Sequence, residues 1–289
     1  VNQQGLRDHN ARLSLALIQR QGGWPGSDIA RLSGLSPQTV SVILRGLEQD
    51  RFLARGERQR GRVGKPRVPM ALNPDGAFAL GLKIGRRSGD LILADLTGAV
   101  RAVRRIGYAY PMPGPILDFL RQGLAELLPE AGPGARIAGL GVAQPSEMWN
   151  WHETLGAPEA DLARWRGLDI AAEIAAFSDL PVTVENDATA AELAEHVLGH
   201  GRELADFAYV FVGTFIGGGV VLNGAVFEGR RGNAGAFGSL PVRGRDGSER
   251  QLIDTASLHL LEREIAALGH DPRGVWARPL DWAAYSAPL

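Results

Sequence analysis

A turn at residues 73–76 (NPDG) separates two stretches of the sequence with different hydrophobic patterns. Before the turn, apolar residues recur three and four positions apart, which is the spacing of the buried side of a helix. After the turn, short apolar runs alternate with helical segments, a pattern typical of an α/β fold with crossover connections. The sequence therefore predicts a small helical part over residues 1–72 and an α/β part over residues 77–289.

The first stretch contains clear signals for a third helix that follows a tight turn. Gly34 supplies the turn, and Ser36 and Pro37 mark the helix start, because serine caps a first turn and proline suits the first helical position. The expected elements are three helices and two strands, over residues 6–21, 27–32, 36–47, 52–55 and 67–72. This order of elements is typical of a winged helix-turn-helix, which is a DNA-binding fold.

Charge is distributed unevenly between the two stretches. Residues 1–72 carry 12 basic and five acidic side chains, a net charge of +7, whereas the remainder carries −8. A basic head on an acidic body indicates contact with a polyanion. Polar side chains that lie off the apolar stripe of the third helix can hydrogen-bond base edges or phosphates in a major groove. They are Gln38, Thr39, Ser41 and Arg45.

The loop between the two predicted strands is rich in glycine and in basic residues. Its cations can neutralise phosphates or enter a minor groove. The residues that we expect to do so are Arg62, Lys65 and Arg67. A solvated helix face and a basic surface loop would give similar residues, but the helix pattern, the loop and the charge together favour DNA binding.

Glu185, Asn186 and Asp187 stand where a predicted strand runs into a predicted helix over residues 187–198. Sites in α/β sheets gather at the carboxyl ends of strands. A carboxylate there could accept a proton from a sugar hydroxyl, and a neighbouring amide could orient the ring. Alternatively, Asn186 or Asp187 only caps the helix. The residues alone leave both interpretations open.

Glycine-rich segments over residues 81–91 (GLKIGRRSGDL), 213–219 and 229–242 could approach phosphates closely, because backbone N–H groups in such turns bind phosphate oxygens. Ordinary tight turns and a surface loop would have the same composition. The first segment carries Lys83 where a nucleotide-binding turn would place an acid, and Phe215 would obstruct close approach to the second.

These segments, in this order behind the basic head, resemble the ROK family of repressors, open reading frames and sugar kinases. The resemblance is carried by ENDATAA (185–191), GTFIGGG (213–219), LNG (222–224), GNAGAFGSLPV (232–242) and GRVGKPRVPMALN (61–73). It implies an actin/hexokinase-like, ribonuclease H-like, two-lobed sugar-kinase-type domain, with a first lobe over residues 77–185 and a second over residues 186–289. The chain continues only briefly past a predicted helix at 252–268, so the second lobe is expected to be shortened.

The same resemblance implies catalytic groups that this sequence has lost. Lys83 stands where family kinases place an Asp for ATP and Mg²⁺, and Phe215 replaces a glycine of the second phosphate turn. Ala236 and Ser239 occupy the places of a sugar-binding Glu and a zinc-binding His. Phosphoryl transfer depends on positioning and on metal-assisted charge stabilisation. We therefore expect no enzyme activity, no catalytic residue, no cofactor and no metal.

Asn186 and Asp187 keep the pair that family kinases use for sugar binding and as general base, so we expect them to bind a sugar or sugar-phosphate effector. The whole pattern favours a DNA-binding transcriptional regulator, in the sense of a repressor of sugar metabolism or transport genes. Its kinase-type domain would be a sensor and dimerisation body, with operator DNA and a second copy of the chain as partners. Two alternatives stay open: an ATP-dependent sugar kinase that carries a DNA-binding head, and a structural dimer scaffold that responds to no metabolite.

Composition narrows the cellular setting. No run of 18 or more apolar residues and no secretion signal are found, so we expect no membrane contact. Cysteine is absent, which excludes disulfides and fits a reducing compartment. We therefore expect a cytoplasmic protein.

Overall fold

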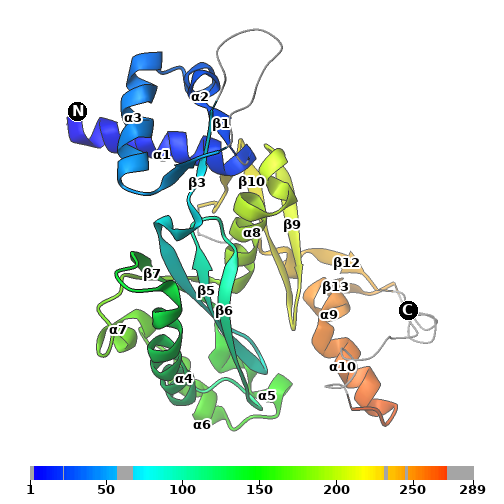
Figure 1. The fold of residues 1–289 in the computed structure, drawn as a ribbon. Coiled ribbons are helices and arrows are strands. Elements are labelled where there is room, and N and C mark those ends of the chain that lie inside the picture. Colours follow the sequence, from blue (N-terminus) through cyan, green and yellow to red (C-terminus); the bar gives the residue numbers. More distant parts are fainter. Residues whose placement is uncertain (1–2, 22, 57–67, 231–233, 245–246, 272–289) are drawn as a thin grey trace. The chain divides into compact units, whose positions relative to one another are not determined.

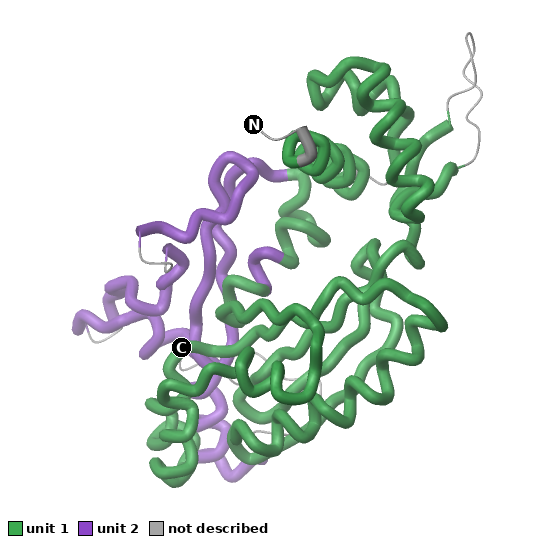
Figure 2. Tube along the Cα trace, turned by 90° about the vertical axis from the view of Figure 1, so that its left-hand side faces the viewer, with its two compact units in different colours: residues 1–190, 194–203 green, residues 191–193, 204–289 purple. Residues whose placement is uncertain are grey.

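The computed structural model describes residues 3–21, 23–56, 68–230, 234–244 and 247–271 (Figure 1). The chain divides into two compact units (Figure 2). The first unit holds residues 1–190 and 194–203, and the second holds residues 191–193 and 204–289. Across the described ranges, no helix is long and apolar enough to cross a lipid bilayer.

The N-terminal part of the first unit consists of three helices and a small antiparallel sheet. The helices α1 (Gln3–Gln21), α2 (Gly26–Ser33) and α3 (Pro37–Gln49) form where the sequence predicts them. The strands are β1 (Trp24–Pro25), β2 (Leu53–Arg55) and β3 (Pro69–Leu72), in the order β1-β3-β2. The sequence predicts only a helix stop at β1, because the partner that makes it a strand, β3, is distant in the chain.

A cap and an apolar core hold α3 in place. The hydroxyl of Ser36 accepts the backbone N–H of Thr39 at 3.1 Å, which satisfies an amide of the first turn. Gly34 ends α2 with φ +70°, a left-handed conformation that glycine adopts without strain. The predicted stripe of α3 faces the core, whose buried residues are Ile18, Ile29, Ala30, Val40, Leu44, Leu47, Leu53 and Met70.

A five-stranded sheet follows the head directly. Its strands are β4 (Phe78–Ile84), β5 (Ser88–Asp95), β6 (Val100–Gly107), β7 (Ile137–Gln144) and β8 (Val182–Asn186), in the order β6-β5-β4-β7-β8. β4 is antiparallel to β5 and parallel to β7, and β7 is parallel to β8. The carboxyl ends of β4, β7 and β8 therefore lie at one edge of the sheet, which is where sites of α/β folds gather.

Helices cover and connect these strands. α4 (Pro113–Leu127) packs against β5 and β6. An added Cβ at Gly123 would lie 2.3 Å from Leu91 Cδ2, so the side chain of Leu91 on β5 packs directly against the backbone of α4. The connection from β7 to β8 contains α5 (His152–Leu155), α6 (Glu159–Leu162) and α7 (Ile170–Ala175). α8 (Asp187–Leu198) starts directly after β8, as predicted.

The second unit contains an antiparallel sheet and a separate hairpin. The sheet consists of β9 (Phe207–Val212), β10 (Ile216–Leu222) and β11 (Ala225–Val226), in the order β11-β10-β9. β12 (Pro241–Arg243) pairs with β13 (Glu249–Gln251).

The prediction of one helix over residues 252–268 is wrong. The structure has two helices, α9 (Ile253–Ala256) and α10 (Leu258–Ala267), separated at Ser257 with φ −79° and ψ 143°. Ser257 is buried, and its hydroxyl donates to Ile253 O at 2.6 Å and accepts the N–H of Ile216 at 3.0 Å. The break is therefore held by a contact with β10 that no local pattern encodes.

Candidate functional site

α3 presents a polar face on the side opposite its buried stripe. Gln38, Ser41 and Arg45 are exposed, and their spacing of three and four residues places them on one side of the helix. Val42 lies on the same side and is 63% exposed. We did not predict Val42 because it is apolar, although its spacing from Gln38 and Arg45 was a usable signal. Such a face can hydrogen-bond base edges and touch a thymine methyl group.

Thr39 belongs to the cap of α3. It is half-buried, and its hydroxyl lies 2.8 Å from the hydroxyl of Ser36. The two hydroxyls hold each other at the helix start, so Thr39 helps to define where the exposed face begins.

The predicted wing cations Arg62, Lys65 and Arg67 fall in residues 57–67, outside the described residues. Their contact with DNA stays a prediction. Just before this segment, Arg55 of β2 donates to both carboxylate oxygens of Glu48, at 2.6 and 2.9 Å. These bonds lower the pKa of Glu48. The exposed pair contributes little to stability, but its two-point geometry fixes the end of β2 against α3.

A second group of polar side chains lies at the carboxyl edge of the five-stranded sheet. Lys83 is near the end of β4, and Gln144 and Asn186 are the last residues of β7 and β8. Strand pairing sets Gln144 opposite Asn186, and Lys83 opposite Ala143. The structure thus brings the predicted effector residues, Asn186 and Asp187, to the same edge as Lys83.

Asn186 caps α8 and is held at both ends of its amide. Its Oδ1 accepts the N–H groups of Ala188 at 3.0 Å and Thr189 at 3.4 Å. Its Nδ2 donates to the hydroxyl of Ser146 at 3.1 Å. The capping interpretation is therefore confirmed for Asn186, and the same bonds hold its side chain in one orientation at the sheet edge.

Asp187 is the first residue of α8 and is half-buried. Burial raises the pKa of its carboxyl group, and the N–H of Ala188 and the positive charge of Lys83 oppose the rise. The carboxyl group and the ammonium group are thus close enough to interact electrostatically. A carboxyl group poised in this way can exchange a hydrogen bond with a ligand hydroxyl.

Gln144 was not predicted as a site residue. Its Oε1 is buried and has no hydrogen-bond partner in the described part of the chain. A buried acceptor of this kind is normally satisfied by a ligand or by water. The usable signal was its place directly after the apolar run at residues 137–143, because sites of α/β sheets gather at the ends of strands.

The β9–β10 turn of the second unit is held by the helix that follows the α9–α10 break. The N–H of Leu258 donates to Gly213 O at 3.0 Å, and the N–H of His259 donates to Thr214 O at 3.2 Å. His259 Nδ1 lies 2.9 Å from the same Thr214 oxygen. The start of α10 therefore fixes the glycine-rich turn, whose mobility would otherwise be large.

Two further contacts occupy this turn. The ring of Phe215 lies 5.0 Å from that of His259, tilted by 52°. The N–H of Ile216 donates to the hydroxyl of Ser257, as described above. An amide that is bonded within the protein is not available to a phosphate oxygen.

The segment that holds Ala236 and Ser239 also forms an internal hydrogen bond. The hydroxyl of Ser239 donates to Ala236 O at 2.8 Å, within a short turn over Phe237–Ser239. Neither side chain offers the carboxylate or the imidazole that the family resemblance would place there.

A mixed five-stranded sheet with polar side chains at its carboxyl edge, followed by a glycine-rich strand turn, is the arrangement of a sugar-kinase-like α/β fold. The solved structure of Lmo2764, a putative N-acetylmannosamine kinase from Listeria monocytogenes, matches 73% of this chain and 72% of its own, with a TM-score of 0.52 and 26% identity. Residues 79–251 match the ROK family, and the chain belongs to this family.

Both regulators and kinases occur among its relatives. The chain is 22% identical to the xylose repressor of Bacillus subtilis, over 84% of its own length and 62% of the repressor's. It is 34% identical to the beta-glucoside kinase of Listeria innocua, over 52% of each chain. A solved structure of a ROK family transcriptional regulator, a homolog of the Escherichia coli MLC protein, matches 98% of this chain and 71% of its own, with a TM-score of 0.65 and 24% identity. The last likeness shows the fold of nearly the whole described chain.

Proposed function

We propose that the chain is a DNA-binding transcriptional regulator of sugar-related genes, with residues 1–72 as a winged helix-turn-helix and residues 77–289 as a ROK domain that senses a ligand. The observation that carries the proposal is the exposed face of α3. Gln38, Ser41 and Arg45 stand on that face within a head of net charge +7. One short helix reads few base pairs, so two copies of the chain on a two-fold axis would give useful specificity.

We propose further that the ROK domain does not transfer phosphate. The residues present do not fit a Mg²⁺-bound nucleotide, because an ammonium group, that of Lys83, stands where an anionic ligand of the metal would be needed. In the glycine-rich turn between β9 and β10, the N–H of Ile216 is already bonded to the hydroxyl of Ser257. Both observations support a sensor in place of a kinase.

The proposed effector site is the sheet edge around Asn186 and Asp187, with a sugar or sugar phosphate as its ligand. Isothermal calorimetry of the full chain with a panel of neutral and phosphorylated sugars tests this part. Asp187→Ala should abolish any heat that the wild-type chain gives. Absence of heat from every sugar would contradict the effector role.

The second candidate is an ATP-dependent sugar kinase, which is favoured by the retained Asp187 and by the 34% identity to a beta-glucoside kinase. Sugar-dependent formation of ADP from Mg²⁺–ATP distinguishes the two. Our proposal expects no ADP above the Asp187→Ala background.

Selection from a random DNA library by the full chain tests the regulator directly. We expect enrichment of a defined sequence motif after several rounds. A library that stays random after selection at low salt would contradict the proposal.

A further inference from the structure

The connection between the head and the five-stranded sheet is short and ordered. β3 ends at Leu72, a 3₁₀ turn spans Pro74–Gly76, and β4 begins at Phe78. The Asn73 side chain accepts the N–H of Asp75 at 3.3 Å. Nothing in this stretch resembles a flexible linker, whose composition would be rich in glycine and serine.

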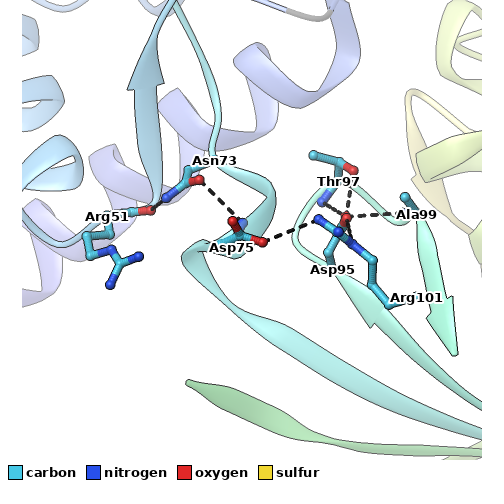
Figure 3. Close-up of polar contacts among 7 residues, drawn as sticks. All are labelled: Arg51, Asn73, Asp75, Asp95, Thr97, Ala99 and Arg101. Atoms are coloured by element: carbon cyan, nitrogen blue, oxygen red, sulfur yellow. Dashed lines mark hydrogen bonds and ion pairs between the residues drawn. The ribbon is translucent and has the colours of Figure 1, made fainter. Parts of the chain in front are cut away.

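The connection folds back onto the corner at residues 50–52, which follows α3. Asn73 Nδ2 donates to Arg51 O at 2.7 Å (Figure 3). The backbone N–H of Asn73 donates to Phe52 O at 2.9 Å. Arg51 adopts φ +66°, a left-handed conformation that is unusual for a non-glycine residue. An added Cβ at Gly76 would lie 2.5 Å from Arg51 O, so only glycine allows this approach.

Arg136 reaches the same corner from the sheet side, one residue before β7. Its guanidinium group donates to Asp50 O at 3.3 Å and stacks over the Phe52 ring, 4.4 Å from the centroid. Asp50 is the C-cap residue of α3, where a positive charge is favourable. The backbone oxygen of Arg136 accepts the N–H of Phe78, which ties it to β4.

Two ion pairs that share Arg101, with Asp75 and with Asp95, hold the other side of the connection. Asp95 is 6% exposed, and its Oδ1 accepts the N–H and hydroxyl of Thr97 at 2.8 and 2.6 Å and the N–H of Ala99 at 3.2 Å. Its Oδ2 accepts Arg101 Nε at 2.6 Å, and the same guanidinium reaches Asp75 at 3.3 Å (Figure 3). Arg101 of β6 therefore links Asp95, at the end of β5, to Asp75 in the 3₁₀ turn.

We infer that Arg136 and the Asp75–Arg101–Asp95 chain are positioning elements for DNA binding, which fix the orientation of α3 on the five-stranded sheet. This inference rests on the proposed function. We call the contacts of residues 50–52, 73–76, 95–101 and 136 the joint between the head and the sheet. β4 starts next to the joint, at Phe78, and ends beside the candidate effector site, at Lys83 and Ile84. Its seven residues span about 20 Å. The strand β4 thus connects the proposed ligand site to the contacts that hold α3, the proposed DNA-reading helix.

The test uses the full chain, the DNA selected by the wild type, and the variants Arg136→Ala and Arg101→Ala. Arg105→Ala is the matched control, because Arg105 lies on the same strand as Arg101, is exposed, and pairs only with Asp90 among the described residues. If the competent orientation of α3 falls to about a fifth of the population, the affinity falls about fivefold. We expect this loss for both variants, and a change within twofold for the control.

The salt dependence separates positioning from direct contact. A variant that loses a phosphate contact lowers the slope of log K against log salt by about 1. The two joint variants should keep the wild-type slope, and the N–H groups of Phe52 and Asn73 should exchange hydrogen faster than in the control. Wild-type affinity or unchanged exchange in both variants would overturn the inference, whereas a wild-type chain that selects no DNA would refute the proposed function itself.

Discussion

The ammonium group of Lys83, near the end of β4, acts on the carboxyl group of Asp187, the first residue of α8, although β7 lies between β4 and β8 in the sheet order. Burial raises the pKa of Asp187 and the positive charge opposes that rise. Lys83 of β4 therefore lies within electrostatic reach of Asp187, the residue that the sequence predicts to bind a sugar.

Asp187→Asn should change how stability depends on pH. The pKa of Asp187 is raised in the folded state, so its contribution to stability is complete below the unfolded pKa and is lost as pH rises through the folded pKa. The variant should lack this decline above about pH 4, where an unperturbed Asp ionises. Denaturant unfolding at a series of pH values measures the difference. Parallel curves for the two proteins would contradict the assignment of a raised pKa.

Ser257→Ala should destabilise the second unit. It leaves the N–H of Ile216 without its partner and removes the hydroxyl that interrupts the helix. The expected loss in the free energy of unfolding is about 1–3 kcal/mol. Ser239→Ala is the control, because that hydroxyl is exposed, and the change should stay within about 0.5 kcal/mol. Equal losses for both variants would remove the structural role of Ser257.

Asp95→Ala should destabilise the first unit and expose the joint. Burial raises the pKa of Asp95, but the bonds from Thr97 and Arg101 outweigh it and lower the pKa overall. The stability that the ionised carboxylate contributes is therefore present above the unfolded pKa and is lost as pH falls through the folded pKa. At pH 7 the variant should lose about 1.5–3 kcal/mol, because the N–H groups of Thr97 and Ala99 lose a charged acceptor. The loss should shrink in acid below about pH 4. A loss that is independent of pH would contradict the ionised state.

Val42→Ala should remove one element of sequence reading. If Val42 contacts a thymine methyl group, replacing that thymine by uracil should weaken wild-type binding about fourfold, the value of one buried methylene. The variant should bind both DNAs equally. Fluorescence anisotropy with the selected site, substituted one thymine at a time, measures this, and a wild-type chain that tolerates every substitution would contradict the contact.

Much of the fold could be predicted from local signals. The cap at Ser36 and the apolar stripe through Val40 and Leu47 place α3, and the strand that runs into residues 187–198 places α8, because these signals depend on neighbours in the chain. The break at Ser257 could not be predicted, since its hydroxyl is held by Ile216, 41 residues away.

In the candidate site, too, local signals predict some residues, and contacts between distant segments determine the others. Residue type and place predict Asn186 and Asp187 as effector residues, and Lys83 stands out by its departure from the family pattern. Gln144 and Arg136 were not predicted, because their importance comes from what surrounds them: an unsatisfied buried oxygen for Gln144 and the end of a helix from another part of the chain for Arg136. Contacts between segments distant in sequence decide such roles.

The central claim is that the exposed face of α3 reads DNA sequence. The most direct measurement is an anisotropy titration of the full chain against the selected DNA and a scrambled DNA of equal length and composition, at physiological salt. The account predicts binding at least about 1,000-fold tighter to the selected site, with Arg45→Ala weakening it and lowering the salt slope by about 1. Equal affinity for the two DNAs, unchanged by Arg45→Ala, would contradict it.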